Sequence, residues 1–242
     1  MTRTNILSLQ FTAAFVLALP LLLRADNPAS GIKFDYSKPA GVTDNSRNDW
    51  KSGRGGKQDG IPDNLMLRIL CPKHTGLTVQ DHPSIFWFMD KPVTGKYKCR
   101  FSITNPNDVE PLFEKDIDPK TAVGIQRMDL KDLTKPLQSN TAYEVSVTII
   151  VPTDQPNEPH SSAEIKRIAA PERLISKLLT RPTPAERAVV YAHDKIWYDA
   201  LAAISDQIVA DPKNAALHQE RAELLRQGEL PDAAHYDESL AK

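Results

Sequence analysis

The side chains that could perform acid–base, nucleophilic or metal chemistry are scattered along this sequence. Its six histidines stand at positions 74, 82, 160, 193, 218 and 235, and their spacing matches no metal-binding motif. The G-x-S-x-G nucleophile elbow and the H-E-x-x-H zinc motif are both missing from the sequence. We therefore predict no catalytic residue, no metal site and no cofactor, although distant residues could still assemble a site in the fold.

Two of these histidines lie close to the most apolar run of the chain. His74 and His82 belong to the segment Cys71–Met89, which ends in the continuous apolar run Ile85–Met89. Such a run is typical of a strand that is buried on both faces, so we expect Trp87 to anchor the core. The alternative interpretation is a ligand-binding groove lined by His74, His82 and Trp87.

The N-terminus has the pattern of a signal peptide over residues 1–25. Arg3 precedes an uncharged stretch whose most apolar part, Phe11–Leu23, has the length of a signal core and is short for a spanning helix. Ala25 supplies the small residue of a cleavage site. We expect an exported protein, periplasmic or secreted, with no stable membrane insertion after cleavage. An uncleaved anchor is the alternative, because Thr4–Leu23 carries no charge.

The two cysteines, Cys71 and Cys99, fall on the inward faces of predicted strands. In an exported protein they could form a disulfide, which would add about 3 kcal/mol by closing a loop. Two unpaired buried thiols are the alternative. Neither belongs to a C-x-x-C pair, so redox or nucleophilic chemistry is not expected.

Composition places the chain among ordinary globular proteins. It has 242 residues, 25% of them charged and 40% hydrophobic, which suits one or two domains. The formal net charge is −1 and the sequence has no basic cluster, which argues against a nucleic-acid partner. Residues 26–63 are polar and rich in turn-forming residues, so we expect a disordered or extended lead-in there.

Residues 64–170 show short segments in which apolar and polar residues alternate. This period of two, repeated between turn signals, predicts an antiparallel immunoglobulin-like β-sandwich. Gly76, between the first two segments, is expected in a turn that needs a positive φ. The predicted strands are Leu65–Cys71, Ser84–Met89, Lys96–Ile103, Pro111–Ile117, Gly124–Leu130, Thr141–Val151 and Ala163–Ile168.

One local pattern sharpens the sandwich prediction. Leu137 and Tyr143 have the spacing seen in the tyrosine corner of fibronectin type III and immunoglobulin-like domains, which this stretch resembles. In that motif the tyrosine hydroxyl bonds to upstream backbone. We therefore expect Tyr143 to be a structural anchor.

Residues 171–230 change to a period of about 3.6, which predicts helices. The first should begin at Pro171, with Leu174, Ile175, Leu178 and Leu179 on one apolar stripe. Thr183, Pro184 and Glu186 match an N-terminal capping box, which predicts a second helix to about His193.

The third helix should begin near Ile196, with Trp197 as an anchor on its apolar face, and end at Asp211-Pro212. A fourth should reach Gln227, with Gly228 as its C-terminal cap. We expect residues 231–242 to be a loosely held tail. The fold class predicted is α+β by segregated domains, with the sandwich followed by a small C-terminal helical bundle.

The third helix and its end resemble the second half of a tetratricopeptide repeat. Ala200, Ile204 and Pro212 occupy its small, bulky and proline positions. Only about one repeat is visible, whereas a peptide-binding groove usually needs three. A packed helical bundle is therefore the simpler interpretation, and peptide capture is the alternative.

Separated blocks of the sequence resemble the bacterial domain-of-unknown-function 928 family over about residues 50 to 230. The resemblance implies an exported protein and supplies no catalytic residues, because the family has no established activity. The chain departs from the pattern at His193-Asp194-Lys195, where a glycine-containing turn is expected. The matching blocks are Pro72–Thr78, His82-Pro83, Phe86-Trp87-Phe88, Glu186-Arg187-Ala188, Tyr191-Ala192, Ile196–Leu201 and Glu223-Leu224-Leu225.

The sequence favours a non-catalytic binding or adaptor module of the cell envelope, whose partner would be an envelope protein or a glycan. One alternative is a sandwich that binds a glycan or small ligand. Another is an uncharacterised hydrolase, which would need a convergent polar pocket with perturbed titratable groups.

Overall fold

The structure is a computed structural model. It describes residues 32–44, 47–51, 60–94, 97–118, 123–132, 135–151, 158–180 and 182–241, with backbone only at 50, 51 and 132. The predicted signal peptide and residues 52–59 of the predicted lead-in lie outside the described residues.

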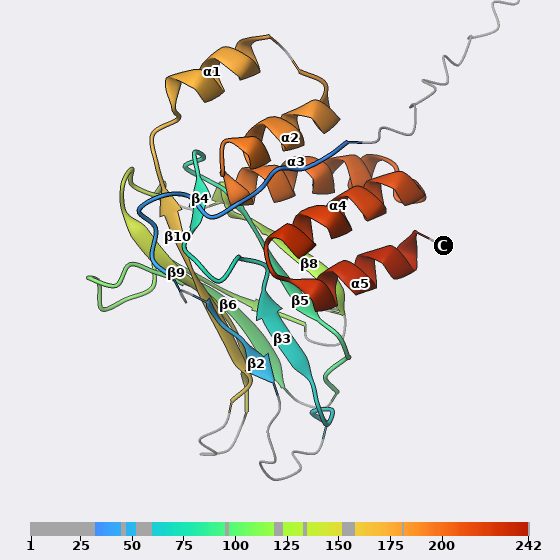
Figure 1. Cartoon of the computed structure of the whole chain (residues 1–242). Coiled ribbons are helices and arrows are strands. Elements are labelled where there is room, and N and C mark those ends of the chain that lie inside the picture. Colours follow the sequence, from blue (N-terminus) through green and yellow to red (C-terminus); the bar gives the residue numbers. More distant parts are fainter. Residues whose placement is uncertain are drawn as a thin grey trace, which may run out of the picture. The chain divides into compact units, whose positions relative to one another are not determined.

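Two packed β-sheets form the body of the molecule and confirm the predicted immunoglobulin-like sandwich (Figure 1). The described strands pair antiparallel except for β4, which pairs parallel with β10. The larger sheet has the order β1 (Arg47–Asn48), β10 (His160–Arg167), β9 (Ala142–Ile150), β6 (Lys98–Thr104) and β7 (Phe113–Ile117), with β4 (Gly76–Thr78) beside β10. The smaller sheet has the order β2 (Trp50–Lys51), β3 (Met66–Ile69), β5 (Ser84–Met89) and β8 (Gly124–Asp129).

Helices follow the strands in sequence, as predicted, and each packs against the next. Helix α3 also contacts β4 and β5, and α5 contacts β8. A short 3-10 turn, η1 (Leu130–Asp132), follows β8. The helices are α1 (Glu172–Leu179), α2 (Pro184–His193), α3 (Trp197–Ala210), α4 (Ala215–Gln227) and α5 (Pro231–Leu240).

Strand β5 is apolar on both faces because both of its faces are covered. On one face Trp87 packs against Phe101 of the larger sheet, with ring centroids 6.0 Å apart. On the other face Phe88 packs against Tyr236 of α5 at 5.5 Å, and Phe86 lies beneath the Arg127 guanidinium. The continuous apolar run is therefore explained by the sandwich on one side and by the helices on the other.

The helices are not a separate domain. One continuous hydrophobic core includes residues from both the sandwich and α1–α5, and all of them fall within one compact unit. Trp197, in the first turn of α3, is fully buried and donates from its indole N–H to the Leu70 carbonyl at 2.8 Å. The predicted boundary at residue 170 thus separates strands from helices without separating two cores.

The tyrosine corner is present in atomic detail. The Tyr143 hydroxyl accepts a hydrogen bond from the Gln138 backbone N–H at 2.9 Å, and Leu137 is fully buried. Along β9, Tyr143, Val145, Val147 and Ile149 are buried, which is the alternation read from the sequence.

The described part of the lead-in is extended and packed rather than disordered. Phe34 and Tyr36 are buried, and Gln227 of α4 bonds to both of them: its amide donates to the Phe34 carbonyl at 2.9 Å and accepts from the Tyr36 N–H at 2.8 Å. The Lys195 ammonium donates to the Asp35 carbonyl at 2.8 Å. These partners satisfy the backbone of a segment that has too few apolar residues to signal burial by itself.

The turn between α2 and α3 has the left-handed backbone that glycine favours. Lys195 occupies it with φ of 65°. Lys195 thus adopts the backbone conformation that a glycine would take at this turn, and its ammonium contacts the lead-in.

The prediction of a loosely held tail over residues 231–242 is wrong, because α5 occupies most of it. Ala233, Ala234 and Asp237 are buried. The Asp237 carboxylate accepts from Arg221 at 2.6 and 2.8 Å, and the His218 ring lies 2.7 Å away. The polar residues that suggested a tail are the partners that fasten α5 to α4.

The apolar stripe predicted on α1 is only partly covered: Leu174 is buried, whereas Ile175 and Leu179 are 46% and 75% exposed. Gly228 is the C-terminal cap of α4, as predicted, with φ of −82°, and the next residue, Glu229, takes a positive φ. A Cβ on Gly228 would lie 2.3 Å from the Trp197 ring, so this glycine is needed for close packing.

Gly76 lies in strand β4 and not in a turn with positive φ, so that prediction is wrong as well. A Cβ there would lie 2.5 Å from the Tyr198 ring and 3.0 Å from the Cys71 sulfur. The glycine therefore lets β4 approach α3 closely enough to pair with β10.

We expect Gly76→Ala to lower the free energy of unfolding by about 3 kcal/mol, because the methyl group overpacks a core that cannot relax freely. Urea denaturation monitored by circular dichroism measures this. Gly41→Ala is the comparison: Gly41 has φ of 75° and open space around it, so only its conformational penalty of about 1 kcal/mol applies. An equal or smaller loss for Gly76→Ala would contradict the packing argument.

Candidate functional site

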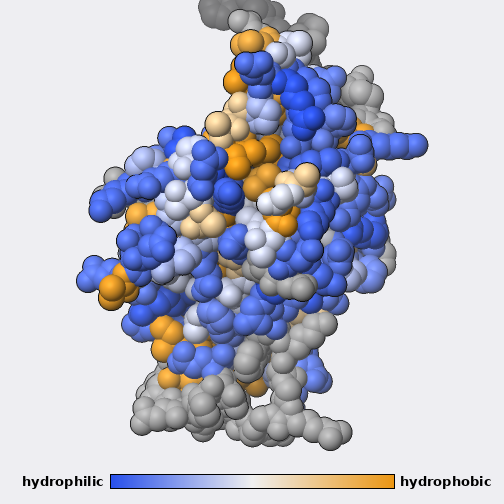
Figure 2. Space-filling view, turned by 60° about the vertical axis from the view of Figure 1, so that its left-hand side comes forward, coloured by the Kyte–Doolittle hydropathy of each residue, from blue (hydrophilic) through white to orange (hydrophobic). Residues whose placement is uncertain are grey.

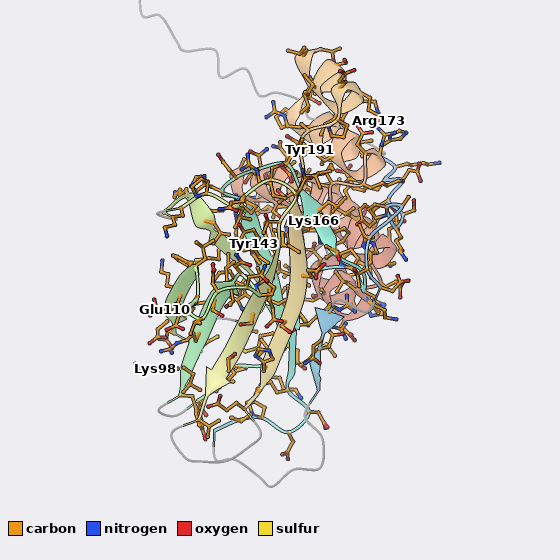
Figure 3. All side chains as sticks on the ribbon, turned by 90° about the vertical axis from the view of Figure 1, so that its left-hand side faces the viewer. Lys98, Glu110, Tyr143, Lys166, Arg173 and Tyr191 are labelled. Carbon is orange, nitrogen blue, oxygen red and sulfur yellow. The ribbon has the colours of Figure 1, made fainter. Side chains whose placement is uncertain are left out.

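A polar cleft of about 200 Å³ lies where α2 and α3 meet the connection between β4 and β5. Tyr191, on its helical wall, lies at the junction of the helices and the sandwich (Figure 3). Strand β8 contributes the remaining wall. The polar side chains that line the cleft include Gln80, His82, Arg127, Arg187, Tyr191 and Asp199.

Asp199 is the most unusual group in the cleft. It lies in the first turn of α3 and is only 5% exposed. One of its carboxylate oxygens accepts from the Val79 backbone N–H at 3.2 Å, and the other, Oδ1, has no hydrogen-bond partner among the described residues. Burial raises the pKa of Asp199 to about 6, and hydrogen bonds from the Thr78 and Gln80 side chains and from the Val79 N–H offset part of that rise.

Arg127 is held on the opposite wall by the pairing of β5 with β8. Its guanidinium bonds to Asp129 at 2.5 Å and to the Ser84 hydroxyl at 2.8 Å, and it also pairs with Asp206 of α3. Ser84 in turn donates to Asp129 at 2.6 Å. Although burial acts to raise it, hydrogen bonds from Ser84 and Arg127 lower the pKa of Asp129. Arg127 therefore carries a charge that neighbouring carboxylates already neutralise.

The rim of the cleft offers further polar groups. His82 lies 2.9 Å from Asp81, and this contact lowers the pKa of the Asp81 carboxyl. Arg187 is exposed and forms no ion pair within the described part of the chain. Burial and the Asp199 carboxylate raise the pKa of Tyr191, so its hydroxyl remains protonated and can donate.

The two histidines singled out in the sequence do not meet. His82 lines the cleft, whereas His74 is buried beneath the lead-in, stacked on Tyr36 with ring centroids 5.9 Å apart. Burial lowers the pKa of His74, which favours the neutral ring. Trp87 lies inside the sandwich. The groove of His74, His82 and Trp87 is therefore not formed.

Both cysteines are free buried thiols, so the bridge considered between them is not formed in the structure. Cys71 follows β3 in the smaller sheet and lies 3.5 Å from the His74 carbonyl, while Cys99 lies in β6 of the larger sheet. Burial raises the pKa of Cys71 to about 11 and that of Cys99 to about 12. The thiolate form is thus scarce, which makes both poor nucleophiles.

The sequence reasoning missed Arg127, Asp199 and Asp206 as site residues. One signal was available: Asp199 is a lone acid in the buried run from Trp197 to Leu201. A charged residue in such a run indicates either a buried partner or a site. Its partners could not be read, because Val79 and Asp199 are 120 residues apart in sequence.

Within the residues that the structure describes, no cluster of three or more histidine, cysteine, aspartate or glutamate side chains could hold a metal ion. Over the same residues, no helix combines the length and apolarity that a membrane crossing requires.

Comparison with known proteins gives a family and no activity. The family model described as Domain of Unknown Function (DUF928) matches residues 50–237. No curated protein matches the chain significantly. Among solved structures, a DUF3244 family protein with an immunoglobulin-like β-sandwich fold from Bacteroides vulgatus is 13% identical, with a TM-score of 0.25; the match covers 51% of this chain and 95% of that one.

The buried acid predicts a pH-dependent stability. The folded pKa of Asp199 is about 6, above the unfolded value of about 3.9, so the folded state binds the proton more tightly. Between about pH 7 and pH 4 this group therefore stabilises the fold as pH falls, by up to about 3 kcal/mol.

Asp199→Asn should remove that dependence. We expect the substitution to be more favourable at about pH 7 than at about pH 4.5, because only the ionised carboxylate carries the burial penalty. Urea denaturation at both pH values measures the difference, with the exposed Asp108→Asn as control. An identical effect of Asp199→Asn at both pH values would refute the raised pKa.

Proposed function

The chain belongs to the family described as Domain of Unknown Function (DUF928), and since that family assigns no activity, we propose from the cleft itself that this is an exported, non-catalytic binding protein for a small polar ligand. Its expected ligand is an uncharged molecule rich in hydroxyl groups, such as one saccharide unit.

The observation that carries this proposal is the unpartnered Oδ1 of Asp199. A buried acceptor without a donor costs about 1–3 kcal/mol, and native structures rarely leave one. Asp199 lines the cleft, but Oδ1 itself has almost no exposed surface, so a small local shift must uncover this oxygen before a ligand can reach it. A ligand hydroxyl that donates to this oxygen would recover the missing hydrogen bond.

The other groups of the cleft favour an uncharged ligand over an anion. Asp129 and Asp206 already neutralise Arg127. Of the basic side chains that line the cleft, only Arg187 at the rim has no ion-pair partner among the described residues. Gln80 and the protonated Tyr191 hydroxyl hydrogen-bond to each other, and Gln80 also bonds to Asp199; each still has donor or acceptor capacity left for a ligand. Alternating donors and acceptors of this kind suit a polyol, and a volume of about 200 Å³ suits one small unit.

The adaptor interpretation receives less support from the fold. It rested on the leader, the sandwich and the repeat-like helices, and here those helices share their core with the sandwich. Removing the helices by truncation after residue 170 would expose the outer face of β5. Such a truncated chain therefore cannot test whether the helices bind a partner.

A hydrolase is the second candidate, because one observation favours it. Asp199 has a raised pKa, while Asp206 faces the Arg127 guanidinium two turns further along α3. Seven residues correspond to about 10.5 Å along a helix. Two carboxyl groups in different environments resemble the acid and base pair of glycoside hydrolysis, but this spacing exceeds the roughly 6.5–9.5 Å that separates such pairs in inverting enzymes.

Ligand binding can be tested on the purified mature protein with a panel of neutral mono- and disaccharides, by saturation-transfer NMR. We expect at least one saccharide to bind and Ala203→Phe, which fills the cleft, to weaken binding by about tenfold or more. Val209→Phe is the matched control, because Val209 lies on the same helix and is 75% exposed away from the cleft.

Three results would count against the proposal. If no saccharide binds, or if Ala203→Phe binds as well as the parent, the cleft is not a saccharide site. If a bound oligosaccharide is cleaved and Asp199→Asn stops the cleavage, the hydrolase is correct and the non-catalytic interpretation is wrong.

Export is the second part of the proposal, and the apolar stretch before Ala25 supports it. We expect intact-mass analysis of the protein from envelope fractions to show a chain that begins at Asp26. Ala25→Leu should impair cleavage and leave a membrane-associated precursor. A parent protein that keeps residues 1–25 in the membrane would favour the anchor instead, and a protein found only in the cytoplasm would contradict export.

A further inference from the structure

A second cavity, of about 600 Å³, lies between α1, α2 and the start of the described lead-in. We call it the α1–α2 groove. Its volume falls within the usual range of small-molecule sites, and it shares no lining residue with the polar cleft. Figure 2 shows a mainly hydrophilic face on which hydrophobic residues gather in the upper half, at the height of α1 and α2 in Figure 1.

Polar contacts at both sides hold the walls of the groove, and one of them is made by the lining residue Lys177. A buried carboxylate, Asp194, draws α1 toward the end of α2 through Arg173 at 2.7 Å and Lys177 at 3.5 Å. On the other side, Gln227 and Lys195 fasten the extended backbone around Phe34 and Asp35. These contacts therefore hold in place the elements that form the walls of the groove.

The groove has an apolar lining and a basic rim. Its apolar surface comes from Ile32, Pro182, Val189 and Val190. Lys33, at the rim, is exposed and forms no ion pair in the part of the chain that is described.

The acid of the groove, Glu186, is ionised but forms no ion pair with Lys33 among the described residues. Glu186 serves the capping box of α2, where its carboxylate accepts from the Thr183 N–H at 2.7 Å and from the Thr183 hydroxyl at 2.9 Å. An uncommitted ammonium beside an apolar trough is complementary to a molecule with an anionic head and an alkyl tail.

We propose that the α1–α2 groove binds one molecule of an anionic amphiphile, a long-chain carboxylate, with its tail along Val189 and Val190 and its head at Lys33. The concave shape favours a single tail over a flat bilayer surface. The most exposed apolar side chain of α1, Leu179, is not part of the groove lining, so the two occupants can be told apart by substitution.

Isothermal titration of the mature protein with decanoate tests the proposal. We expect saturable binding of one decanoate per chain. Val190→Asp should weaken it by about tenfold or more, because it places a charge against the tail. Lys33→Ala should weaken decanoate binding by about threefold and leave 1-decanol binding unchanged, because the alcohol has no charge to lose. Lys38→Ala, on the same segment and paired with Asp44, is the control and should change neither.

Membrane adsorption is the competing outcome, and vesicles of phosphatidylglycerol measure it by co-sedimentation. If the protein sediments with vesicles, if Leu179→Ser prevents this and if decanoate does not bind saturably, a bilayer surface is the partner and the single-molecule proposal is overturned. Decanoate binding that Val190→Asp leaves intact would overturn the groove as its site.

Discussion

The rest of the structure depends on the packing of the buried Trp197 side chain. Its indole N–H bonds to the Leu70 carbonyl, which is 127 residues away in sequence, and thereby joins α3 to the end of β3. Tyr36 of the lead-in meets the same ring edge-on at 4.9 Å, and Gly228 lets the end of α4 approach it from another side. One side chain thus ties together the sandwich, two helices and the lead-in, and the boundary between strands and helices cannot be a boundary between domains.

Features that depend on neighbouring residues were predictable from the sequence. The alternation in β9, the apolar run of β5 and the capping box at Thr183 each reflect local periodicity or local hydrogen bonding, and the structure shows each of them. The tyrosine corner belongs to the same class, since Gln138 and Tyr143 are only five residues apart. Local signals of this kind were sufficient for the class of fold.

Features that depend on distant partners were not predictable. Gly76 looks like a turn residue until β10 and Tyr198 are placed beside it. In the sequence, the charged residues of α5 suggest a solvated polar tail. In the structure, Asp237 of this helix is buried against Arg221. The cleft could not be predicted from the sequence for the same reason. Arg127 and Asp206 are 79 residues apart, and only the packing of α3 on the smaller sheet brings them together.

Asp199 links this fold to its proposed function. The Val79 N–H and the side chains of Thr78 and Gln80 hydrogen-bond to the Asp199 carboxylate at the junction of β4 and α3, and they offset part of its burial penalty. One carboxylate oxygen, Oδ1, still lacks a hydrogen bond of good geometry among the described residues. Under the proposed function, a ligand hydroxyl that donates to this oxygen would offset a further part of the penalty.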